Sequence, residues 1–129
     1  MSKIDHGLAG AWRLESWTFE YDDGRREFPL GPEARGMLLY TPDGQVSATL
    51  MSATSMGAGQ PHASLAYAGR YDERDGVVHH SIDIASDPAL VGVTTTRHIA
   101  RDGEKLTLSG PDFRSGTGRS QKIVWRRLS

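Results

Sequence analysis

The sequence contains no cysteine, which excludes disulfide bonds, thiolate metal sites and a cysteine nucleophile. It has no apolar run near the ~20 residues that a membrane-spanning helix needs. Its first ten residues, MSKIDHGLAG, lack the apolar segment of a secretory signal. Net charge is also small, because 15 basic and 16 acidic residues give −1 without a basic patch. We therefore expect a cytosolic (cytoplasmic) protein that binds neither nucleic acid nor membrane.

Helical patterns are nearly absent, whereas turn signals recur. A length of 129 residues fits one domain with one core, so we predict a single domain over residues 1–129. Residues 1–9 would form an extension or a short helical turn. Glycine and aspartate tolerate the positive φ of tight hairpins, so four Asp-Gly pairs predict four hairpins. These pairs are Asp23-Gly24, Asp43-Gly44, Asp75-Gly76 and Asp102-Gly103.

The segments between these turns are rich in β-branched and aromatic residues, which favours eight or nine strands. Successive hairpins indicate an up-and-down meander, and about eight strands can close into a barrel that holds one small ligand. We predict an all-β fold, a single antiparallel barrel of eight to ten strands. A two-sheet sandwich remains the alternative. The segment 52–64 would be its long connection, or a lid over the barrel mouth.

Two adjacent histidines follow Asp75-Gly76. Successive strand residues face opposite ways, so His79 and His80 cannot both point inward. A two-residue turn pairs Tyr71 with His80 and Tyr67 with Ile84, which gives one apolar face and one polar face. The apolar face consists of Tyr67, Gly69, Tyr71, Val78, His80, Ile82 and Ile84. We expect His80 inside, opposite Tyr71, and His79 in solvent.

The hairpin at Asp102-Gly103 predicts a buried arginine. A two-residue turn places Arg97 and Thr95 on the same face as the leucines of the next strand, whereas a three-residue loop would place His98 there instead. A buried arginine is costly unless it is paired, so an inward Arg97 requires a polar partner, a ligand carboxylate or phenolate, or a place near the barrel mouth. The expected pairs are Ile99 with Leu106 and Arg97 with Leu108.

The buried face is clear for the strands on either side of Thr41 to Gly44 and ambiguous for the first strand. The turn TPDG (Thr41 to Gly44) is typical of a type I turn, which pairs Leu38 with Ala48 and Tyr40 with Val46. On the first strand both faces carry aromatic residues, so the buried face stays open. One face has Trp12, Leu14, Ser16 and Thr18, and the other has Arg13, Glu15, Trp17 and Phe19.

Several segments occur in an order that resembles the bacterial and fungal lipocalin-like domain family. They are GLAGAWRLESW, FPLGPEARGMLLYTPDGQVSATLM, YAGRYD, VVHHSIDIA, LVG and VWRRL, and they extend from about Gly10 to Leu128. The resemblance implies a bacterial, up-and-down barrel with an internal pocket. Gly10-Ala11-Trp12 also resembles the Gly-x-Trp signature of lipocalins, which implies that Trp12 stacks beneath Arg127 or Arg126 at the barrel floor.

An apolar pocket with a few converging polar groups is the usual form of a small-molecule site. We therefore predict that the barrel binds a small, largely hydrophobic molecule, with an anionic group where Arg97 contacts it. The predicted ligand-binding residues are Leu38, Tyr40, Tyr67, Tyr71, His80, Ile82 and Arg97.

Two other functions remain open. The first is a cofactor-free enzyme of the isomerase, cyclase or hydratase/lyase type, in which His80 moves a proton and Tyr71 or Arg97 stabilises negative charge. Some relatives occur near biosynthetic genes, so the resemblance implies secondary metabolism. The second is an interaction module that forms a homodimer through exposed Trp17 and Phe19. No cofactor or metal is predicted, because His79 and His80 diverge along a strand and cannot chelate one ion.

Overall fold

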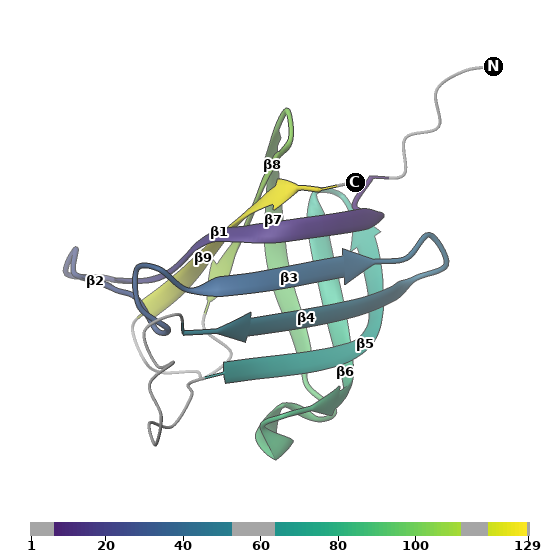
Figure 1. Ribbon diagram of the computed structural model, residues 1–129, viewed down its shortest axis with the longest axis horizontal. Helices are drawn as coiled ribbons and strands as arrows, with labels where there is room; N and C mark the ends of the chain where they lie inside the picture. Colours follow the sequence, from purple (N-terminus) through teal and green to yellow (C-terminus); the bar gives the residue numbers. More distant parts are fainter. Residues whose placement is uncertain (1–6, 53–63, 112–118, 129) are drawn as a thin grey trace.

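The computed structural model describes residues 7–52, 64–111 and 119–128, which form an antiparallel β-barrel (Figure 1). The strands follow the order β2-β1-β3-β4-β5-β6-β7-β8-β9, and an additional pairing of β1 with β9 closes the sheet. Their bounds are β1 Gly10–Tyr21, β2 Arg26–Glu27, β3 Arg35–Tyr40, β4 Gln45–Met51, β5 Ser64–Arg74, β6 Val77–Ala85, β7 Thr94–Asp102, β8 Lys105–Pro111 and β9 Arg119–Arg127. The predicted barrel is confirmed, and the sandwich alternative is wrong.

Eight strands make the barrel, and β2 is a two-residue addition that pairs with the far end of β1. In Figure 1, β1, β3, β4 and β5 lie in front and β6 to β9 lie behind. The connection between β6 and β7 contains a 3-10 turn at Pro88–Leu90, which the Asp87 side chain caps. Of the extension or short helical turn expected over residues 1–9, residues 1–6 lie outside the described residues, as does nearly all of the long segment 52–64.

All four predicted Asp-Gly hairpins are present, between β1 and β2, β3 and β4, β5 and β6, and β7 and β8. Their glycines have positive φ, from 60° at Gly103 to 99° at Gly44. At Asp75-Gly76 both residues have positive φ, 54° and 76°, which is the backbone of a type I′ turn. These turns set the register on which the inward and outward faces depend.

The expected faces of β3 and β4 are confirmed, because Leu38 pairs with Ala48 and Tyr40 with Val46. In the next hairpin Tyr71 pairs with His80 and Gly69 with Ile82, also as expected. The prediction that Ile84 pairs with Tyr67 and faces the interior is wrong.

A bulge near Gly69 explains this error. The register shifts between Ala68 and Gly69, so that Tyr67 pairs with Ala85 instead of Ile84. The extra residue reverses the face of the strand end. Ile84 therefore lies on the outer surface, 66% exposed.

The hairpin of β7 and β8 keeps the predicted faces in a different register. Asp102 pairs with Lys105, so the turn consists of Gly103 and Glu104, one residue later than expected. Ile99 therefore pairs with Leu108 and not with Leu106. A shift of two residues leaves each side chain on its own face. Thr95 and Arg97 are accordingly buried, as predicted.

A second bulge explains the two aromatic faces of β1. The register with β9 shifts between Leu14 and Ser16. Trp12 and Leu14 are buried before the shift, and Trp17 packs against the core after it. Phe19 is only 8% exposed. Each face of β1 is thus buried along part of its length, and Trp17 and Phe19 do not form the exposed aromatic patch expected of an interaction module.

One end of the barrel is closed by Trp12, which has no exposed surface. Its indole Nε1 donates to the carbonyl of Leu8 at 3.0 Å. The guanidinium of Arg127 lies 4.2 Å from the centre of the indole ring and donates to the carbonyls of Gly7 and Ala9, at 3.0 Å each. This geometry confirms the contact implied by the resemblance and fixes the chain that enters β1.

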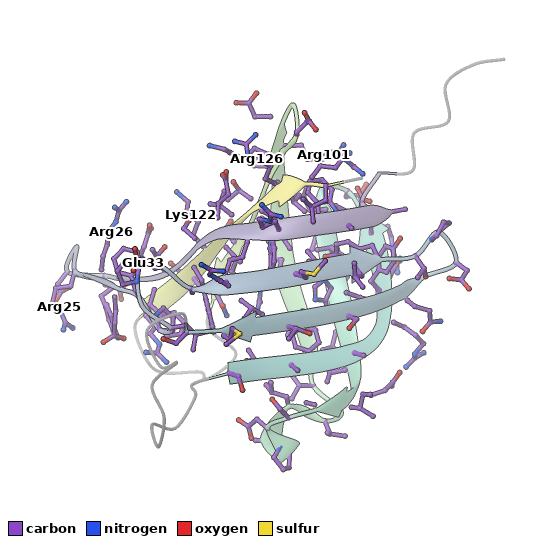
Figure 2. All side chains as sticks on the ribbon, viewed as in Figure 1. Arg25, Arg26, Glu33, Arg101, Lys122 and Arg126 are labelled. Carbon is purple, nitrogen blue, oxygen red and sulfur yellow. The ribbon has the colours of Figure 1, made fainter. Side chains whose placement is uncertain are left out.

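Replacing Arg127 by methionine keeps the length of the side chain but removes the cation and its donors. We expect Arg127→Met to lower the free energy of unfolding by about 2–3 kcal/mol, measured by urea denaturation. Arg126 projects from the outside of β9 and pairs with Glu15 at 2.8 Å (Figure 2). Arg126→Met should therefore cost less than about 1 kcal/mol. Equal losses in the two variants would contradict a closing role for Arg127.

The bulge at Gly69 leaves no room for a side chain. A Cβ atom at this residue would lie 1.9 Å from the carbonyl oxygen of Ser81. We expect Gly69→Ala to lower the free energy of unfolding by about 2–4 kcal/mol, because the backbone of β5 and β6 must separate. A loss below about 1 kcal/mol in urea denaturation would show that the bulge tolerates a methyl group.

Candidate functional site

His80 lies within β6 and is 2% exposed. Its Nε2 atom is 2.6 Å from the hydroxyl oxygen of Tyr40, and its Nδ1 atom is 2.6 Å from that of Tyr67. Tyr40 ends β3 and Tyr67 belongs to β5, so three strands supply this group, which we call the tyrosine–histidine cluster. Strands β3 and β6 are not neighbours in the sheet, and the curvature of the barrel brings their inward side chains together.

The two hydrogen bonds of His80 have different directions. A neutral imidazole carries one N–H donor and one acceptor nitrogen. One tyrosine therefore donates its hydroxyl proton to His80, and the other accepts the N–H of His80. Both ring nitrogens are satisfied, which a buried imidazole requires.

All three members of the cluster are uncharged at neutral pH. Burial lowers the pKa of His80 to about 3, and the charges of Arg97 and His79 act in the same direction. Burial also raises the pKa of Tyr67 to about 12 and that of Tyr40 well above its usual value. The cluster is therefore a set of hydrogen-bonding groups and not an ion pair.

Two polar residues of β7 face the same interior. Thr95 is the strand partner of His80 and is 5% exposed, and its Oγ1 atom finds no hydrogen-bond partner. Arg97 is 7% exposed and donates from Nη1 to the carbonyl of Thr96 at 3.0 Å. Its charge lowers the pKa of both Tyr67 and Tyr40, against the larger effect of burial. The guanidinium thus acts on the same cluster.

Tyr71, which the sequence pairs with His80, lies opposite it in the strand register but does not bond to it. The Tyr71 hydroxyl donates to the carbonyl of Thr41 at 2.7 Å. The ring packs edge-on against Tyr40, with 4.5 Å between centroids. Tyr71 therefore supports the cluster from the side of the β3–β4 turn, and Tyr40 and Tyr67 hold the hydrogen-bonding positions.

The other predicted site residues supply the apolar wall. Leu38 is 1% exposed and Ile82 is 3% exposed. Two interior polar residues were not among the predicted site residues. The Trp17 indole N–H donates to Gln121 Oε1 at 3.0 Å, and Gln121 is almost fully buried. The bulge in β1 turns the Trp17 side chain toward Gln121. No signal in the sequence marks that bulge.

The adjacent histidines diverge, as expected. His79 Nδ1 lies 3.2 Å from Thr96 Oγ1, away from the interior cluster. Within residues 7–52, 64–111 and 119–128, no three His, Asp or Glu side chains gather in a way that could hold a metal ion. In the same ranges, no helix has the length and apolar character that crossing a membrane would need.

The outer face of the barrel carries shallow grooves over β1 and over β3 to β6. One of them has a volume of about 760 Å³ and is lined by Met37, Leu39 and Thr49 among others. A second, of about 370 Å³, includes Leu39 and Ile84. This face is turned toward the viewer in Figure 2. Formation of a homodimer stays a prediction.

Comparison with known proteins supports the fold. A family model described as a lipocalin-like domain matches residues 9–128. A lipocalin-like protein from Bacteroides uniformis is similar, with 17% identity and a TM-score of 0.52, over 94% of this chain and 98% of that one. An uncharacterized protein from Bacteroides eggerthii shares 14% identity with a TM-score of 0.51, over 93% and 98%. The lipoprotein YedD from Klebsiella pneumoniae has 14% identity and a TM-score of 0.48, over 99% and 77%. No curated protein matches the chain.

The buried state of His80 predicts its behaviour on titration. Its pKa is about 3 in the folded protein and about 6.5 in the unfolded chain. We expect the ¹⁵N shifts of its ring to remain those of a neutral imidazole from pH 8 to pH 5. Titration of this ring between pH 6 and 7 would contradict its burial.

The same shift makes stability depend on pH. Only the unfolded chain binds a proton at residue 80 between about pH 6.5 and 3, so stability is retained above this range and lost as the pH falls. The expected slope from this one group is about 1.4 kcal/mol per pH unit. His80→Asn should reduce the slope in urea denaturation at a series of pH values, and an unchanged slope would contradict the assignment.

Proposed function

Because this chain belongs to the lipocalin-like domain family, we propose that it binds one small, largely hydrophobic molecule inside its barrel. The observation that carries the proposal is the polar group made by the tyrosine–histidine cluster, Thr95 and Arg97 within a largely apolar interior. Buried polar groups cost stability compared with a well-packed apolar core. A barrel that served only as a scaffold would have no need of them, whereas a binding site uses them to orient a ligand.

A cofactor-free enzyme is the second candidate, and the bridging imidazole favours it. A neutral histidine held between two phenols can accept a proton at one nitrogen as it releases one from the other. Such a group suits an isomerase, cyclase or hydratase/lyase that moves a proton. Both nitrogens of His80 already face tyrosine hydroxyls, so a phenol and not the imidazole would contact the substrate.

Native mass spectrometry of freshly purified protein tests the binding proposal. We expect a co-purifying molecule, or failing that, a ligand from a screen of hydrophobic carboxylates and phenols by thermal shift. A ligand at about 100 times its Kd stabilises the folded state by about 2.7 kcal/mol, which raises Tm by several degrees. A molecule recovered unchanged after incubation indicates a binding protein, and a converted molecule indicates an enzyme.

A matched pair of variants locates the ligand. Ala48 faces inward beside Leu38 and Tyr67, whereas Thr49 faces the outer groove. Ala48→Leu should abolish the thermal shift, because the larger side chain would compete with a ligand for the interior next to the cluster, and Thr49→Leu should preserve it. The reverse result would place the ligand in the outer groove and contradict the proposal.

A further inference from the structure

One hydroxyl proton of the tyrosine–histidine cluster takes part in neither of its two hydrogen bonds. Only one of the two phenols can donate to neutral His80, because the other receives the N–H of the ring. In the described part of the chain, neither hydroxyl has a second hydrogen-bond partner. The phenol that accepts from His80 therefore has a proton to donate elsewhere, in a buried place where an unmade hydrogen bond is costly.

Tyr67 is the better candidate for this free donor. Tyr40 is only 3% exposed and packs against the Tyr71 ring, whereas part of the Tyr67 residue is exposed although its hydroxyl group is buried. Arg97 lowers the pKa of both phenols, whereas the charge of Glu73 raises that of Tyr40, so Tyr67 is the more acidic donor. The arrangement is then Tyr40 O–H to Nε2, and Nδ1–H to the oxygen of Tyr67.

Thr95 provides a second donor without an acceptor. Its hydroxyl is buried beside His80 and makes no hydrogen bond. Inside the barrel, the buried polar side chains that the structure describes are hydroxyls, an imidazole, an amide and a guanidinium. None of these is a carboxylate, so no described buried group would repel an anion.

We infer that the polar end of the interior ligand is an oxyanion, a carboxylate, phenolate or enolate, that accepts hydrogen bonds from Tyr67 and Thr95 beside Arg97. This inference rests on the proposed function and specifies the ligand class of that same site. Hydroxyl donors that lack an acceptor in the protein gain one from the ligand, and a charged acceptor makes the stronger bonds. His80 acts as a positioning residue, because it holds the Tyr67 oxygen by one hydrogen bond and directs its proton toward the ligand.

Matched acid and amide pairs test the charge of the ligand. The pairs are benzoate with benzamide, 2-naphthoate with 2-naphthamide, and octanoate with octanamide, measured by calorimetry at pH 7.5. We expect the acid of the best pair to bind about tenfold tighter or more than its amide. Amides that bind as well as the acids would overturn the oxyanion inference and leave interior binding intact. If no member of any pair binds, the proposed function itself fails.

Conservative variants then locate the donors. Tyr67→Phe should weaken acid binding about tenfold and change amide binding less than about twofold. Tyr71→Phe is the matched control, because the Tyr71 hydroxyl bonds to Thr41, and it should leave both affinities unchanged. Equal effects of the two tyrosine variants on acid binding would overturn the role of Tyr67.

Thr95→Val provides a signature that a merely structural role would not give. Removal of an unpartnered buried hydroxyl should raise the Tm of the free protein while it weakens acid binding about tenfold. A variant with lower Tm and unchanged acid affinity would show that Thr95 supports the fold and not the ligand. Thr95→Val keeps the β-branched shape of the side chain. The comparison of Tm with acid affinity also leaves the charge of Arg97 in place.

Discussion

The pairing of β1 on both sides is the constraint on which the rest of the structure depends. β1 bonds to β3 at its first residues and to β9 along most of its length, so the eight barrel strands have no free edge. Closure is what turns inward side chains of distant strands toward a common interior. Tyr40 and His80 are 40 residues apart, and two strands, β4 and β5, lie between theirs in the sheet, yet their polar atoms lie 2.6 Å from each other. An open sheet with the same register would not bring them into contact.

Burial then determines the chemistry of what closure brings together. An imidazolium in this interior would lose its hydration and would lie near Arg97, so the neutral form of His80 is strongly favoured. A neutral ring offers one donor and one acceptor, and the two flanking phenols are the side chains that can satisfy both without adding charge. Among the buried side chains that the structure describes, the charged one at this place is Arg97. Hydrogen-bond donors and one cation therefore define the polarity of the interior.

Local signals in the sequence were sufficient for much of this structure. The Asp-Gly turns predicted the hairpins, and alternation placed His80, Thr95 and Arg97 inside, because strand parity follows directly from turn position. The two bulges were not predictable, since they arise from contacts with neighbouring strands, and they explain both the outward Ile84 and the mixed faces of β1. The contact of His80 with Tyr40 depends on the curvature of the closed barrel, and the contact with Tyr67 crosses the bulge near Gly69, so reasoning from pairing within one hairpin selected Tyr71. A cytosolic location stays a prediction.

The position of His80 changes the interpretation of the cluster. An inward histidine in a barrel suggests a general base, but a base needs a nitrogen that can reach its substrate. Both nitrogens of His80 are occupied, so any ligand meets a phenol, a threonine hydroxyl or the guanidinium of Arg97 first. A histidine that served only for packing would account for the hydrogen bonds to Tyr40 and Tyr67, but it would not account for the unpartnered hydroxyl of Thr95 on the adjacent strand. The arrangement is therefore better explained by an imidazole that orients hydroxyl donors than by one that takes protons from a ligand.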